Sequence, residues 1–110
     1  MTLNEKKQYL LNYKMYQAKI RRLSELIADY PEDAERLKPQ LLESTKLRDK
    51  IENEISLLGN PIFSEILAQK YQCGKTLEEI AFCMNYSTRH IERLHTNALK
   101  IFEPLDFTNT

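Results

Sequence analysis

Residues 76–100 read TLEEIAFCMNYSTRHIERLHTNALK and indicate the fold of the C-terminal half of the chain. Thr76 and Glu79 have the spacing of a capping box, in which each side chain accepts a hydrogen bond from the backbone N–H of the other residue. The apolar residues that follow recur at helical spacing; they are Leu77, Ile80, Ala81 and Met84. The pattern predicts a helix of only two to three turns that begins at Leu77.

The next residues predict a tight turn and a second helix. Asn85 is one of the few residue types that adopt a positive φ readily, and Ser87 is a favoured N-cap residue. The second helix is expected from Thr88 to about Phe102, because Pro104 follows it. Two short helices joined by a tight turn have the layout of a helix-turn-helix, whose second helix can enter the major groove of DNA.

The second of these helices is predicted to be amphipathic. Ile91 and Leu94 lie at the spacing of a core-facing stripe. The residues left on the outer face are polar or charged; they are Thr88, Arg89, Glu92, Arg93 and Thr96. That outer face is the surface with which the helix would contact a partner.

A boundary precedes this motif at Gly59-Asn60-Pro61, which combines a helix stop, an N-cap candidate and a proline suited to the first helical position. It divides the chain into a unit at residues 1–59 and a unit at residues 60–110. The second unit is expected to begin with a helix over about residues 61–72. Gly74 can then take the left-handed conformation that ends a helix.

The N-terminal unit is predicted to begin with one long helix over about residues 3–29. Apolar residues recur there in alternating steps of four and three, as a helical packing seam requires. The members of this seam are Tyr9, Tyr13, Tyr16, Ile20, Leu23, Ile27 and Tyr30. The helix is expected to end near Tyr30, because Pro31 disfavours helical geometry at the residue before it.

A second helical pattern follows and ends at Gly59. Its apolar positions are Leu37, Leu41, Leu47, Ile51, Ile55 and Leu58. Pro39 would kink a helix interior but is harmless in a first turn. We therefore expect a short turn at residues 32–38 and the main helix from about residue 39.

The charges favour pairing of these two helices. Residues 1–27 carry a net charge of +4 and residues 28–59 a net charge of −3, so an antiparallel, coiled-coil-like hairpin brings opposite charges together. A hairpin alone buries little surface and is marginal unless something covers its other side. We expect that cover to be a second copy of the chain. The dimer seam would be formed by Tyr9, Tyr13, Tyr16, Ile20, Leu23 and Ile27.

The amino-acid composition predicts the fold class. The chain has 110 residues, two glycines, four prolines and no tryptophan. Few of its residues are suited to strands joined by tight turns, so we expect an all-α protein. No apolar stretch is long enough for a signal peptide or a membrane helix, and two cysteines are few for a secreted scaffold, so we expect a cytoplasmic protein without a membrane partner. No glycine-rich phosphate loop or Ser-His-Asp order is visible, so we expect no enzymatic activity.

The C-terminal half resembles a known family. Residues 61–102 are similar to the fourth region of sigma factors, which reads promoter DNA with a helix-turn-helix; the stretch that follows that pattern is LAQKYQCGKTLEEIAFCMNYSTRHIERLHTNALKIF. The likeness runs from Tyr71 and Gly74 through residues 77–81 to residues 98–100. With its helical N-terminal half, the whole chain resembles small phage and prophage transcriptional regulators of the RinA and ArpU type, and the run IERLHTNALKIF is particularly like them.

The resemblance implies binding to double-stranded DNA by the helix that begins at Thr88. As a transcriptional regulator, the protein would read neighbouring half-sites or engage RNA polymerase near a promoter. Arg89 and Arg93 are the best candidates for contacts to bases or phosphates, since a guanidinium suits bidentate contact with guanine. Ser87 and Thr88, at a helix N-terminus, suit phosphate. The complete predicted DNA-contacting set is Ser87, Thr88, Arg89, His90, Glu92, Arg93, Thr96 and Lys100.

Other interpretations stay open. The formal net charge of the chain is zero and that of residues 60–110 is −1, whereas a DNA reader is usually more basic. Either the basic residues of the first helix add to the DNA contact, or the motif docks on a protein such as RNA polymerase or a phage packaging component like a small terminase subunit. The two arginines could also form a solvated face with salt bridges to Glu92 or Glu79.

Metal binding is not expected. His90 and His95 lie five residues apart on one predicted helix, which places them about 140° apart around its axis, so they cannot chelate one ion. We therefore predict neither a metal nor a cofactor.

Overall fold

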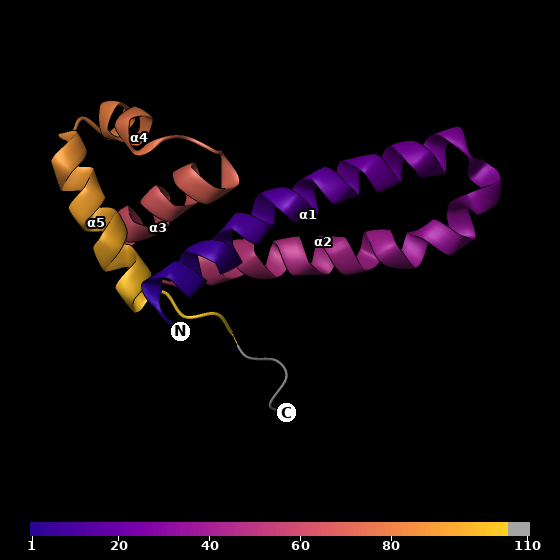
Figure 1. Cartoon of the computed structure of the whole chain (residues 1–110), viewed down its shortest axis with the longest axis horizontal. Helices are drawn as coiled ribbons and strands as arrows, with labels where there is room; N and C mark the ends of the chain where they lie inside the picture. The colour runs from indigo at the N-terminus through magenta and orange to yellow at the C-terminus, as the bar shows by residue number, and fades with distance from the viewer. Residues whose placement is uncertain (106–110) are drawn as a thin grey trace.

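The computed structural model describes residues 1–105 and is helical throughout, with no strand in that range (Figure 1). This confirms the predicted all-α class. The elements are α1 (Leu3–Asp29), η1 (Pro31–Asp33), α2 (Ala34–Ser56), α3 (Pro61–Leu67), η2 (Ala68–Gln72), α4 (Leu77–Met84) and α5 (Thr88–Ile101). Residues 106–110, the end of the predicted second unit, lie outside the described residues.

The long helix α1 has the bounds that its apolar spacing predicts. Thr2 and Glu5 form a capping box at its start, with Thr2 Oγ1 accepting from the Glu5 N–H at 3.1 Å and Glu5 Oε1 from the Thr2 N–H at 2.9 Å. At its other end, the Tyr30 N–H still donates to Leu26 at 2.8 Å before Pro31 turns the chain. Local signals in the sequence are therefore enough to place both ends of α1.

The start of α2 differs from the expectation. The predicted turn at residues 32–38 is wrong: a single 3₁₀ turn over Pro31–Asp33 leads directly into α2, and Pro39 lies inside the helix. Leu37 is buried, which favours continuing the helix back over this segment. Position 39 is exposed, so water can hydrate the carbonyl that a proline leaves without an N–H donor.

The helices α1 and α2 lie side by side in an antiparallel hairpin (Figure 1). Tyr13 and Leu23 of the predicted dimer seam are buried at 8% and 2% exposure within this single chain. Tyr9 and Tyr16 pack against the same chain's core, and Ile20 and Ile27 are half-buried. The seam expected to join two copies is therefore packed largely inside one chain, and association of two copies stays a prediction.

The C-terminal elements pack against the base of this hairpin. Asn60 caps α3, its side chain accepting from the N–H groups of Ile62 and Phe63 at 3.0 and 3.2 Å. The last turn before Gly74 is π-helical rather than α-helical, with the Cys73 N–H bonded to Ala68 at 3.1 Å. Gly74 then has the expected positive φ of 75° and leads the chain toward α4.

One hydrophobic core joins the two halves of the chain. Its largest cluster draws on α1, α2, the α3–η2 segment and the end of α5; its buried members are Leu10, Tyr13, Ile51, Ile55, Leu67, Tyr71, Ala98, Leu99 and Phe102. A smaller cluster of Ile66, Ile80, Ala81 and Ile91 holds α3, α4 and α5 together. The division at residues 59 and 60 stays a prediction, but the main core crosses it.

The length and apolar character of a helix decide whether it can cross a membrane. Over residues 1–105, no helix combines the length and the apolar character that crossing a bilayer requires.

Candidate nucleic-acid interface

The entry into α5 has the turn that the sequence predicts. Asn85 is left-handed with φ 60° and ψ 41°, and it ends α4. The next N–H, that of Tyr86, donates back to the Ala81 carbonyl at 2.9 Å. Ser87 is extended, and its Oγ accepts from the His90 N–H at 3.1 Å, so the first turn of α5 is capped.

The capping box of α4 is also formed. Thr76 Oγ1 accepts from the Glu79 N–H at 3.1 Å and Glu79 Oε1 from the Thr76 N–H at 2.9 Å. The hydrogen bond from the Thr76 N–H to the carboxylate favours its charged form and lowers the pKa of Glu79. Glu79 therefore takes part in capping the N-terminus of α4.

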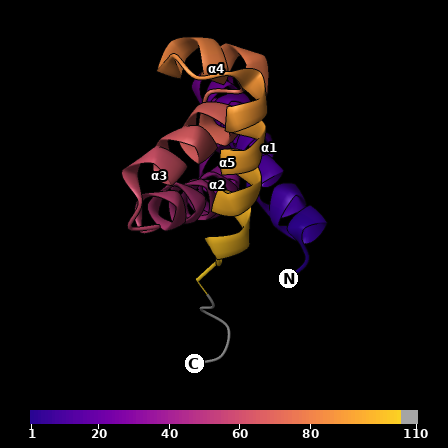
Figure 2. The ribbon, with the colours of Figure 1, turned by 90° about the vertical axis from the view of Figure 1, so that its left-hand side faces the viewer.

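One side of α5 is buried and the other is open. The buried residues are Ile91, His95, Ala98 and Leu99. Figure 2 looks onto the opposite side, where α5 runs in front of the molecule with α4 above its N-terminal end and α1 behind it. A partner can therefore approach the outer face of α5 without displacing another helix.

The structure places all of the predicted contact residues on or beside this open side. Ser87, Arg89, Glu92, Arg93 and Lys100 are exposed, whereas Thr88, His90 and Thr96 are half-buried. Arg89, Arg93, Thr96 and Lys100 follow one another at three- and four-residue steps and so share a face. Lys100 lies in the last turn, about 16 Å along the helix axis from Arg89, so the set forms a stripe rather than a cluster.

The two arginines differ in their surroundings. Arg93 Nη2 lies 2.6 Å from His90 Nδ1. Because arginine can only donate, His90 Nδ1 accepts and the ring proton is on Nε2. The His90 ring also meets the edge of Tyr86 at 4.9 Å between centroids. Over residues 1–105, neither Arg89 nor Arg93 forms an ion pair with Glu92 or Glu79.

The far end of α5 is anchored by a residue that sequence reasoning missed. Lys6 is only 8% exposed, and its Nζ donates to the carbonyls of Leu99 at 3.0 Å and Lys100 at 3.1 Å. A cation at a helix C-terminus satisfies carbonyls that lack intrahelical donors. No local pattern marks Lys6, because its partners lie more than 90 residues away in the chain.

The middle of α5 is fixed by a buried hydrogen bond between His95 Nε2 and Tyr71 Oη, at 2.8 Å. Burial raises the pKa of Tyr71 to about 12. Burial, together with the positive charges of Lys70 and Lys7, lowers the pKa of His95 to about 4. His95 is therefore neutral at neutral pH, and it faces away from His90. Within residues 1–105, no group of three His, Cys, Asp or Glu side chains could hold a metal ion.

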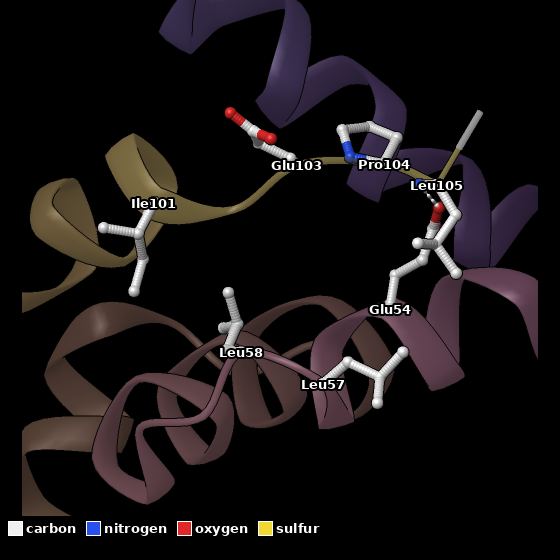
Figure 3. Close-up of a pocket in the computed structure, with 7 residues that line it drawn as sticks. All are labelled: Glu54, Leu57, Leu58, Ile101, Glu103, Pro104 and Leu105. Carbon is white, nitrogen blue, oxygen red and sulfur yellow. Dashed lines mark hydrogen bonds between the residues drawn. The ribbon is translucent and has the colours of Figure 1, made fainter.

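A hollow at the end of α5 is closed by polar contacts of the chain itself (Figure 3). Glu54 is buried in its wall and accepts hydrogen bonds from Tyr9 Oη, from Lys50 Nζ at 2.8 Å and from the Leu105 N–H. The floor is apolar and includes Leu57. The Glu54 carboxylate therefore joins α1, α2 and the segment after α5.

The open side of α5 thus offers guanidinium, ammonium, imidazole and hydroxyl groups beside a capped helix N-terminus, which suits contact with anions and with base edges. No family model, no curated protein and no solved structure matches the chain. A function can therefore be inferred only from the residues of the chain itself.

Proposed function

We propose that the protein is a sequence-specific DNA-binding transcriptional regulator, in which α4 and α5 act as a helix-turn-helix and α5 enters the major groove. This is the function of the sigma-region-four-like phage regulators that the sequence resembles. The observation that carries the proposal is the uncovered face of α5, with Arg89 and Arg93 exposed on adjacent turns behind a serine-capped N-terminus.

Each part of that face has a role in the proposal. Arg89 and Arg93 donate to guanine O6 and N7, or to phosphates at the groove edge. Ser87 and Thr88, with the first N–H groups of α5, lie at the end of the helix that favours phosphate. Lys100, at the other end of the stripe, is long enough to reach the sugar-phosphate backbone.

The first experiment selects duplex fragments from the source genome with the purified protein at low and moderate salt, followed by sequencing. We expect an enriched motif. A motif with two-fold symmetry would indicate that two copies bind one site.

The variant Arg89→Ala with Arg93→Ala tests the assigned face. We expect loss of binding to the selected duplex with an unchanged thermal unfolding midpoint, because both side chains are exposed. The control is Arg36→Ala with Lys38→Ala, which removes the same charge from the exposed start of α2 and should leave binding intact. Normal binding by the Arg89 and Arg93 variant would show that this face does not read DNA.

A second candidate function is a module that docks on RNA polymerase or on another protein. The observation that favours it is Phe82, which is 89% exposed on α4, with the ring of Tyr86 37% exposed four residues later. A large apolar side chain that is almost fully exposed is a candidate for contact with a protein partner.

This candidate predicts no duplex binding even at low salt. It also predicts binding to purified RNA polymerase that Phe82→Ser removes while the fold is retained. Salt-sensitive duplex binding that Phe82→Ser leaves unchanged would favour the DNA-binding regulator.

A further inference from the structure

A groove beside α5 is bordered by lysines from two other elements. It lies between the first turns of α1, the η2 segment, the start of α4 and the inner edge of α5. Its lining includes Lys7, Leu11, Lys70, Leu77 and Thr96. The groove thus begins where the open side of α5 meets α1.

Lys7 and Lys14 lie on one face of α1. Lys7 and Lys14 are seven residues apart, which is close to two turns and about 10 Å along the axis. Both are exposed. The Lys14 side chain reaches across to the turn before α4, where its Nζ lies 2.5 Å from the position that a Cβ on Gly74 would occupy.

Lys70 adds a third positive charge from the opposite wall of the groove. Its Nζ lies 5.7 Å from the centre of the Tyr71 ring, so the side chain lies over that ring. Lys70 and Lys7 both contribute to the lowered pKa of His95, although burial is the larger cause, which places both ammonium groups near the middle of α5. Glu92 lies at the same groove and offsets one of the three positive charges.

We propose that Lys7, Lys14 and Lys70 form a phosphate-binding track along which the backbone of duplex DNA passes while α5 reads the bases. The inference rests on the proposed DNA-binding function and extends it to a surface outside α5. It also accounts for the charge of residues 60–110, whose net −1 is low for a DNA reader. Positive charge is available on α1, because all of the charged side chains that give residues 1–27 their net charge of +4 lie in this helix.

The test combines Lys7→Gln, Lys14→Gln and Lys70→Gln in one full-length variant and measures duplex affinity against salt concentration. Each phosphate contact contributes about 0.9 to the slope of log affinity against log salt. We expect the slope to become shallower by about two to three. The affinity should fall by a similar factor for the selected duplex and for an unrelated one, since phosphate contacts carry no sequence information.

The control replaces three lysines elsewhere on the hairpin, Lys19, Lys38 and Lys46, with glutamine and so makes the same change in net charge. We expect its salt slope to stay close to that of the unmodified protein. Circular dichroism checks folding, and the double variant of the exposed residues Lys7 and Lys14 replaces the triple variant if the latter does not fold.

The outcomes separate the two proposals. Unmodified protein that binds duplex, with equal slopes in the track and control variants, would overturn the track and leave α5 as the reader. Unmodified protein without salt-sensitive duplex binding would overturn both, and this would be seen before any substitution is made.

Discussion

Single residues from distant parts of the chain hold α5 in place. Lys6 bonds the carbonyls at its C-terminal end, and Tyr71 bonds His95 in its middle. The buried polar groups of Lys6, Tyr71 and His95 thus each have a partner, which offsets the free energy of removing them from water. With its inner face held in this way, α5 presents its outer face in one orientation.

The buried histidine makes stability depend on pH. The pKa of His95 is about 4 in the folded chain, against an ordinary value of 6.5. As the pH falls from 6.5 toward 4, the unfolded chain therefore binds a proton at this position and the folded chain does not, so the folded state loses stability in that window.

The variant His95→Gln checks this, because glutamine does not titrate and can still bond Tyr71. We expect its free energy of unfolding, measured with urea at several pH values, to fall less between pH 6.5 and 4 than that of the unmodified protein. Parallel curves for the two proteins would show that His95 does not titrate differently on folding.

Among the elements, α2 departs most from its local sequence signals. Its helix continues through Pro39, where the proline ring removes one hydrogen bond and crowds the preceding turn. The burial of Leu37, two residues earlier, offsets this. Packing between α1 and α2 therefore outweighs a local helix breaker.

Replacing Pro39 with alanine should stabilise the protein. We expect a gain of about 2 kcal/mol in the free energy of unfolding, which is the helix-interior penalty of proline less its restriction of the unfolded chain. Urea denaturation measures it. The matched control is Gln40→Ala at the next exposed position, for which we expect a much smaller change. A loss of stability in Pro39→Ala would contradict a continuous helix through this position.

For the whole molecule, the shared core makes the two predicted units depend on each other. Phe102 at the end of α5 is fully buried in the same cluster as Leu10 of α1 and Ile55 of α2. A change at Phe102 should therefore affect the hairpin as well as the C-terminal helices.

Phe102→Ala should lower the free energy of unfolding by about 3–5 kcal/mol, as expected for a large cavity in a core. Hydrogen exchange should show amides of α2 and α4 losing protection together. The neighbouring Ile101→Ala, at a position that is 49% exposed, should change stability little. If the α2 amides of Phe102→Ala keep full protection while the amides of the C-terminal helices lose it, the two units unfold separately.

The sequence alone determined what short-range chemistry controls. The two capping boxes, the serine cap of α5, the positive φ of Asn85 and the proline stop after α1 each depend on residues within a few positions of one another. The helical class, most helix bounds and the exposed face of α5 follow from such signals. The DNA-reading role of that face is a prediction from the sequence that the experiments above test.

How those helices meet depends on contacts between distant residues, which the three-dimensional structure shows. The structure showed that the chain's own helices pack on the predicted dimer seam, that α2 runs through Pro39, and that Lys6, Lys7 and Lys70 gather around α5. These features join residues that are tens of positions apart in the chain. Local propensity and periodicity do not reveal such partners, because which apolar faces meet is decided by the packing of the whole core.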